Sequence, residues 1–190
     1  MAEFKDKIIE DLISLCRIEN FSKTTLHECL RLVFSWALTA RDDNGNSAKY
    51  FGCPYWSEAA LAQYDKNKNA KDLRHEHVIP RTIFNNSIEK YRDDYILSAD
   101  FNYEECFSFL KGHISDKLFA CIITKDEDKM FSQNKVSRCM PDGEDDFFNI
   151  TKKWARYKAA GVTHIRKVKW SKPGKNSDWE YLVSEDFELE

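Results

Sequence analysis

The sequence has no Cys-x-x-Cys pair among its 190 residues, so the commonest sign of a structural zinc site is missing. No apolar run approaches the roughly 20 residues of a membrane-spanning helix, and the N-terminus has no basic region leading into an apolar segment. From these two features we expect no signal peptide and no transmembrane span. The net charge is −3, so the chain lacks the global basic field of a dedicated nucleic-acid-binding protein. Internal repeats and low-complexity tracts are also absent from the sequence.

What the sequence does contain is enough apolar and aromatic side chain for a packed core. Hydrophobic residues make up 42% and aromatic residues 14% of the chain, which argues against disorder. The six cysteines are widely spaced and lie mostly in apolar surroundings, which is typical of reduced, buried thiols in a cytosolic protein. A length of 190 residues then favours one domain, residues 1–190.

Hydrophobic periodicity predicts an α+β fold. Residues 3–18 and 22–38 have the spacing of two amphipathic helices, which would form an N-terminal helical hairpin within residues 1–46. After them, the predicted helices cover residues 57–64, 81–95, 102–113, 124 onward and 147–160, and the predicted strands cover residues 73–79, 118–123, 163–170 and 179–183. The last helix and the last two strands form a C-terminal unit, residues 145–184, that ends in a β-hairpin. The acidic tail 185–190 is expected to fray.

Residues 73–81 hold two of the five histidines of the chain. Their composition is typical of a short strand that Pro80 ends. Because side chains alternate between the two faces of a strand, His75 and His77 are predicted to project on one face and Glu76 on the other. Two imidazoles at i and i+2 can converge on one ion, one phosphate or one water, which ordinary core packing rarely requires.

The run Glu76-His77-Val78-Ile79-Pro80 resembles the first motif of the HNH (ββα-metal) nucleases. That motif is an acidic residue or histidine, then a histidine, two aliphatic residues and a proline. The resemblance implies that His77 is the general base that activates water against a phosphodiester, and that Glu76 binds a divalent metal. A second stretch, residues 122–129, is similar to the strand-and-helix part of the motif and puts Asp128 near the position of another metal ligand.

Hydrolysis of a phosphodiester by such an enzyme needs a hard divalent cation, and carboxylate ligands suit Mg²⁺ or Mn²⁺. His75 can be a further ligand or orient the attacking water, and Arg81 can hold a phosphate bidentately. A zinc site made by Cys53 with the two histidines is less favoured. If the strand is regular to its end, Glu76 and His77 cannot face the same site. Either the backbone kinks near Glu76, or His75 replaces Glu76 as the ligand.

The predicted C-terminal hairpin concentrates basic residues that would compensate for the acidic net charge. Neutralisation of phosphates together with aromatic stacking is how a nucleic-acid contact is made, so DNA or RNA would be the partner. Charged hairpin edges also arise to block edge-to-edge association of sheets, and both interpretations stay open. The candidate nucleic-acid-binding residues are Arg166, Lys167, Lys169, Trp170 and Lys172.

The sequence thus indicates an α+β protein with a helix-rich domain around a ββα-metal-like unit, the HNH-like core lying within residues 47–135. The function indicated is that of a divalent-metal-dependent nuclease. The alternative is a non-catalytic binding protein, such as an immunity, inhibitor or regulatory module, which the net acidity and the missing Cys-x-x-Cys pair favour. A metal-dependent phosphoesterase acting on nucleotides is a third candidate. A protein partner, the choice between DNA and RNA, and the oligomeric state stay open.

Overall fold

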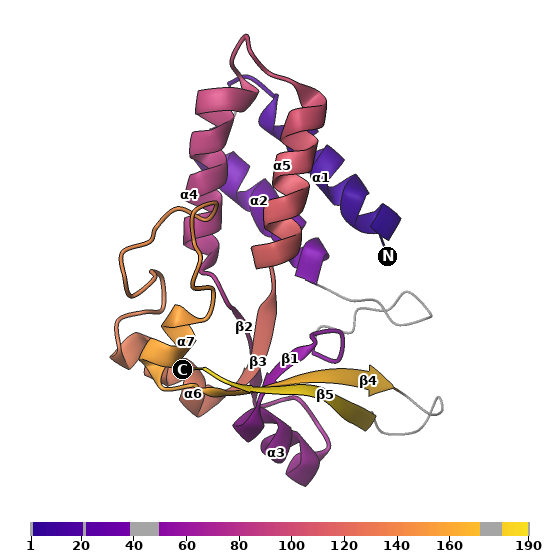
Figure 1. Cartoon of the computed structure of the whole chain (residues 1–190), viewed down its shortest axis with the longest axis vertical. Helices are drawn as coiled ribbons and strands as arrows, with labels where there is room; N and C mark the ends of the chain where they lie inside the picture. The colour runs from indigo at the N-terminus through magenta and orange to yellow at the C-terminus, as the bar shows by residue number, and fades with distance from the viewer. Residues whose placement is uncertain (1, 21, 39–49, 172–179, 190) are drawn as a thin grey trace.

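The fold combines a group of helices with a five-stranded mixed sheet, which confirms the α+β class (Figure 1). The computed structural model describes residues 2–20, 22–38, 50–171 and 180–189. The helices are α1 (Ala2–Cys16), α2 (Lys23–Leu38), α3 (Glu58–Asn67), α4 (Arg81–Tyr91), the π-helix η1 (Arg92–Ile96), α5 (Tyr103–Lys117), α6 (Lys125–Gln133) and α7 (Ala155–Ala160). The strands are β1 (Tyr55–Ser57), β2 (Leu73–His77), β3 (Ala120–Thr124), β4 (His164–Ser171) and β5 (Glu180–Glu188).

The sheet has the order β2-β3-β1-β4-β5, in which β1 is parallel to β3 and the other neighbours are antiparallel. Helix α3 packs on one face of the sheet through Ala60, Leu61 and Tyr64. Helices α6 and α7 pack on the other face, where Phe131 and Tyr157 are fully buried. Because helices cover both faces, the inner strand β3 is buried at every position, as its unbroken apolar run predicts.

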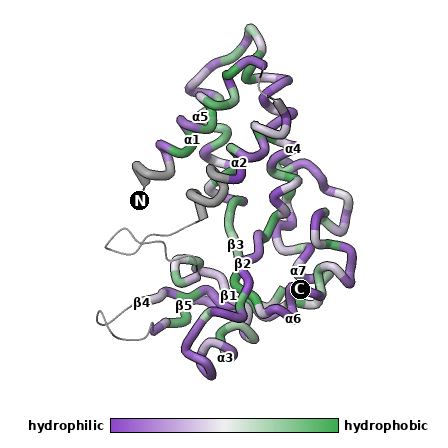
Figure 2. The backbone as a smooth tube through the Cα atoms, turned by 180° about the vertical axis from the view of Figure 1, so that it is seen from behind, coloured by the Kyte–Doolittle hydropathy of each residue, from purple (hydrophilic) through white to green (hydrophobic). Residues whose placement is uncertain are grey.

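A separate hydrophobic core joins the four long helices α1, α2, α4 and α5. Figure 1 shows these helices together above the sheet, and Figure 2 shows the hydrophobic stretch that continues from the helices into β3. Arg92, the first residue of η1, ties the segment after α4 to the end of α1, because its guanidinium donates to the carbonyl oxygens of Cys16 and Ile18, each at 2.9 Å. Such donors satisfy carbonyl groups that have no partner within the helix.

Strands β2 and β3 and helix α6 form the two-strand-and-helix unit that the sequence predicts. The two strands are antiparallel, and α6 begins directly after β3. The Thr124 hydroxyl accepts from the backbone N–H of Glu127, and the Glu127 carboxylate accepts from the backbone N–H of Thr124, which confirms the capping box. In sequence, α4, η1 and α5 are inserted between the two strands.

The predicted helix over residues 147–160 is wrong in its first half, because only α7 is helical there. The backbone before α7 bonds to other parts of the chain instead. Lys117 donates to the carbonyl oxygens of Phe147 and Phe148, and the N–H of Phe147 donates to the Ser87 hydroxyl. Tertiary hydrogen bonds therefore take the backbone groups of Phe147 and Phe148, beside a single turn in which the N–H groups of Asn149 and Ile150 donate to the carbonyl oxygen of Asp146.

The C-terminal hairpin is confirmed, but its second strand continues to Glu188, so the prediction of a frayed acidic tail is wrong. Two acids of this tail pair with bases on β4, Glu185 with Lys167 and Asp186 with Arg166. These cross-strand pairs and the strand ladder extend β5 beyond the predicted end. The predicted turn at residues 171–176 lies almost entirely outside the described residues.

Candidate functional site

Strand β2 is regular, so its side chains alternate as the sequence predicts. His75 stands opposite Ile122 and His77 opposite Ala120 on β3, which puts both imidazoles on the α3 face of the sheet. The two ring centroids lie 5.6 Å apart with an interplanar angle of 82°. Both side chains are half-buried at the edge of the sheet. The strand therefore presents a pair of imidazoles side by side to one region of space.

Glu76 lies on the opposite face, against α7. Its Oε1 atom is 2.6 Å from Nη2 of Arg156, a residue that is 0% exposed. Burial raises the pKa of the Glu76 carboxyl above its usual 4.5; the Arg156 guanidinium opposes this rise and the neighbouring Asp128 adds to it. The carboxylate thus has a permanent cationic partner inside the protein.

Arg156 holds β2 through the backbone as well as through Glu76. Its Nη1 donates to the carbonyl oxygen of His77 at 2.5 Å, and its Nε donates to the carbonyl oxygen of Val136 at 3.0 Å. The guanidinium also lies over the ring of Phe131, 4.6 Å from its centroid. A guanidinium has five N–H donors in a rigid plane, so one buried arginine can join α7, the chain after α6 and β2.

Tyr157 adds a second contact to the same strand. Its hydroxyl donates to the carbonyl oxygen of Glu76 at 3.1 Å, and the side chain is fully buried. The consecutive residues Arg156 and Tyr157 therefore hold the backbone of Glu76 and His77 from the sheet face that is opposite the imidazoles. These bonds fix the strand from which His75 and His77 project.

Asp128, on α6, lies on the side of Glu76 and away from the imidazoles. Its Oδ2 is 3.9 Å from Nε of Arg74, which shares the Glu76 face of β2. The expected grouping of Glu76, Asp128 and His77 around one cation is therefore not formed, because a regular strand separates Glu76 and Asp128 from His77. The described ranges also hold no cluster of three or more His, Cys, Asp or Glu side chains that could bind a metal ion. These residues do not fit the metal site that the resemblance implies.

Cys53 does not suit a zinc site with the two histidines. Its thiol donates to the carbonyl oxygen of Ala120 at 3.0 Å and is buried. Burial raises the pKa of the Cys53 thiol to about 12, and two backbone hydrogen bonds oppose this rise. Because a metal binds the thiolate form, this thiol is a poor ligand.

Arg81 is exposed in the first turn of α4, which follows β2 after Pro80. The pKa of the Glu28 carboxyl on α2 is lowered, mainly by the hydrogen bond from Arg31, and the positive charge of Arg81 lowers it further. Arg81 therefore lies where the sheet meets the helical part.

Two of the basic residues of the hairpin, Arg166 and Lys167, are paired with acids. Lys167 lies 2.9 Å from Glu185, and Arg166 pairs with both Glu58 of α3 and Asp186 of β5. Lys169 is exposed on β4, and Lys172 lies outside the described residues.

Trp170, which the sequence offers as a stacking platform, packs into the aromatic cluster beside α3. Its ring centroid is 4.7 Å from that of Trp56, 5.0 Å from those of Phe51 and Tyr64, and 4.9 Å from that of Tyr181. The ring is partly buried and packs against the core cluster beside α3.

Comparison with known proteins gives no match: no family model, no curated protein and no solved structure resembles the chain. Among the described helices, none has both the length and the apolar character needed to cross a membrane.

Proposed function

We propose that the protein is a nuclease whose reaction centre is the pair His75 and His77. The single observation that carries the proposal is that the two half-buried imidazoles stand together on one face of β2, 5.6 Å apart at their centroids. Imidazole is the side chain that most readily takes up and releases a proton near neutral pH. A neutral and a charged imidazole are the base and the acid of a general acid–base reaction.

RNA is the substrate that this pair suits best. Its 2′-hydroxyl supplies the nucleophile within the substrate, so two proton-transfer groups can carry the reaction. His77 takes the proton of the 2′-hydroxyl, and O2′ attacks the phosphorus. The bond from phosphorus to O5′ breaks as protonated His75 gives its proton to O5′, which leaves a 2′,3′-cyclic phosphate and a 5′-hydroxyl. Each nitrogen must come within roughly 3 Å of its oxygen, and rings at this separation can serve two oxygens of one phosphate.

The contacts behind β2 support the proposal. Arg156 and Tyr157 bond to the backbone at His77 and Glu76, and they hold the strand from the face opposite the imidazoles. A catalytic pair needs such fixed backbone, because small displacements of reacting groups cost much of the rate.

The test is cleavage of a fluorophore-labelled single-stranded RNA and of the DNA of the same sequence, each with EDTA and with Mn²⁺. We expect cleavage of the RNA in EDTA, with a bell-shaped dependence of the rate on pH. His75→Asn and His77→Asn should each lower the rate by about 100-fold or more. His164→Asn, on the exposed end of β4, is the matched control and should cleave at the wild-type rate.

Cleavage only with Mn²⁺ would refute the two-imidazole mechanism and support a metal-dependent nuclease instead. No cleavage of either polymer, or unchanged rates in both histidine variants, would refute the nuclease proposal and favour the non-catalytic binding role.

A further inference from the structure

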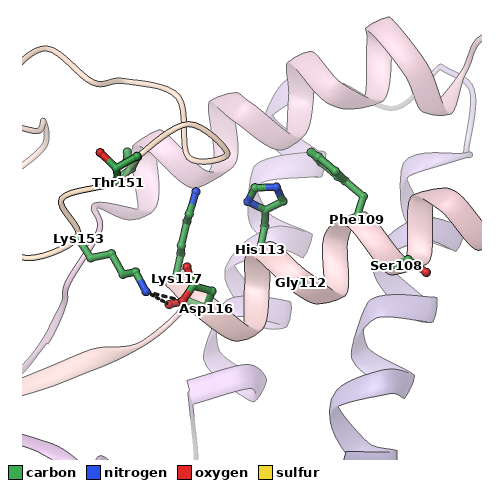
Figure 3. Close-up of a pocket in the computed structure, with 9 residues that line it drawn as sticks. Ser108, Phe109, Gly112, His113, Asp116, Lys117, Thr151 and Lys153 are labelled. Atoms are coloured by element: carbon green, nitrogen blue, oxygen red, sulfur yellow. Dashed lines mark hydrogen bonds and ion pairs between the residues drawn. The ribbon is translucent and has the colours of Figure 1, made fainter.

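A hollow of about 580 Å³ lies between α5 and the chain segment before α7, outside the candidate site. Figure 3 shows Lys117 and His113 rising side by side from α5 towards the segment that carries Thr151. Phe109 and Ile150 give the hollow apolar walls, and the remaining polar lining includes Ser108 and Asp116. The hollow thus combines basic side chains with an aromatic wall.

Lys117 is a buried cation whose contacts include no carboxylate. The residue is 7% exposed, and its ammonium donates to the carbonyl oxygens of Phe147 at 3.1 Å and Phe148 at 2.5 Å. Across the described part of the chain, no carboxylate oxygen lies within 4.0 Å of this nitrogen. An ammonium has three donors, so two carbonyls leave one N–H for another acceptor. A buried charge is unfavourable unless it is paired, so an anion in the hollow would stabilise it.

The charges of Asp116, Asp146 and Glu144 act on Lys117, and the first of these acids is already engaged. Asp116 pairs with Lys153 at the rim of the hollow, and Figure 3 draws this ion pair. Lys153 also donates to the backbone oxygen of Asp116 at 3.2 Å, which fixes both side chains in place. Asp116 is therefore held at the rim by Lys153.

His113 is the second basic group of the hollow. Its ring lies 4.5 Å from the ring of Phe109 and 5.3 Å from that of Phe148. Burial lowers the pKa of His113 from 6.5, and Lys117 lowers it further; Asp116 and Asp146 act in the opposite sense. The imidazole is thus mostly neutral at neutral pH, and a bound anion would favour its protonated form.

We propose that this hollow binds a small organic phosphate, with the phosphate beside Lys117 and His113 and a flat apolar group against Phe109. A phosphate monoester offers several acceptor oxygens, which suits the donors of these two neighbouring side chains. The aromatic wall favours a ligand that also carries a ring. The proposal is independent of any nuclease activity, because none of these residues belongs to β2.

Calorimetric titration with phenyl phosphate tests the proposal, with phenol, phenyl sulfate and inorganic phosphate as comparison ligands. We expect phenyl phosphate to bind with a dissociation constant below about 1 mM and phenol to bind at least about ten-fold more weakly. Weaker binding of inorganic phosphate would show that the ring contributes. Equal binding of inorganic phosphate and phenyl phosphate would overturn the assignment of the apolar wall.

Phenyl sulfate keeps one negative charge at both about pH 5.5 and about pH 8, so a change in its affinity reports the charge of His113. We expect tighter binding at the lower pH, together with a shift of the His113 imidazole signal in proton NMR spectra. Equal affinity at the two pH values would refute the role of His113.

Lys117→Met keeps the aliphatic stem and removes the charge, and it should weaken the binding of phenyl phosphate by about ten-fold or more. Lys152→Met changes an exposed lysine of the neighbouring segment and should leave the affinity unchanged. His113→Gln provides a second variant if Lys117→Met does not fold, and it should abolish the pH dependence. No binding by the wild type up to about 10 mM, or equal binding by Lys117→Met, would refute the proposal.

Discussion

Replacing Arg156 by methionine should destabilise the protein by about 3–5 kcal/mol, because it removes one partner of a buried ion pair. The guanidinium is 0% exposed, and Glu76, its partner at 2.6 Å, is itself mostly buried. The substitution also leaves the carbonyl oxygens of His77, Val136 and Ser137 without their donor. Methionine fills much of the same volume, so the expected loss comes from charge and hydrogen bonding.

The loss should depend on pH through Glu76. The pKa of this carboxyl in the folded protein is already raised from 4.5, so the folded state binds more protons than the unfolded state as the pH passes upward from about 4.5. The free energy of unfolding therefore falls as the pH rises through the interval between the two pKa values. Without Arg156 the folded-state pKa rises further, the interval widens, and the variant should lose more stability at about pH 8 than at about pH 5.

Urea unfolding followed by tryptophan fluorescence at these two pH values measures the effect. Glu76→Gln in the Arg156→Met background removes the uncompensated charge and should recover stability at about pH 8 and less at about pH 5. Arg166→Met, which breaks exposed ion pairs on β4, is the control and should change stability far less. A single Arg156→Met variant as stable as the wild type, or one that loses less stability at the higher pH, would refute the reasoning.

Three further substitutions test other parts of the fold by the same unfolding assay. Thr124→Ala removes the hydroxyl that caps α6 and should cost about 1 kcal/mol; no loss would mean that Glu127 alone stabilises the helix start. Gly161→Ala should cost about 1 kcal/mol or more, because φ is +83° and the new Cβ would lie 3.1 Å from Cε of Met130; a stabilised variant would contradict this geometry. Leu182→Lys, at a side chain that is 72% exposed on β5, should change stability by less than about 0.5 kcal/mol, and a larger loss would reveal a partner for this surface.

Local features of the sequence predicted much of the candidate site. Strand alternation predicts that Glu76 lies on the face opposite His75 and His77, and the regular β2 confirms that separation. The sequence also predicts the buried strand β3 and the capping box at Thr124, because both depend on residues that are close together in the chain. The expected grouping of Asp128 with His77 joined residues that are distant in the chain, and the structure places Asp128 beside Arg74 instead.

Other features that the sequence did not predict also depend on contacts between residues that are distant in the chain. The three-residue strand β1 lies in an aromatic segment broken by Gly and Pro, and only its neighbours β3 and β4 define it. The segment before α7 has helical periodicity, but Lys117 and Ser87 take its backbone groups. Trp170 alternates with lysines as a stacking residue would, yet it packs against Trp56.

The sequence by itself determined the α+β class, the amphipathic helices, the buried strand β3 and the alternation of side chains between the two faces of β2. These follow from periods of 3.6 and 2 residues, which act over a few neighbouring positions. The tertiary structure alone decided that Arg156 pairs with Glu76 and that the buried ammonium of Lys117 donates to two carbonyl oxygens. A buried charge is stabilised by whatever group packing brings to it, and for Glu76 that group comes from 80 residues away in the chain.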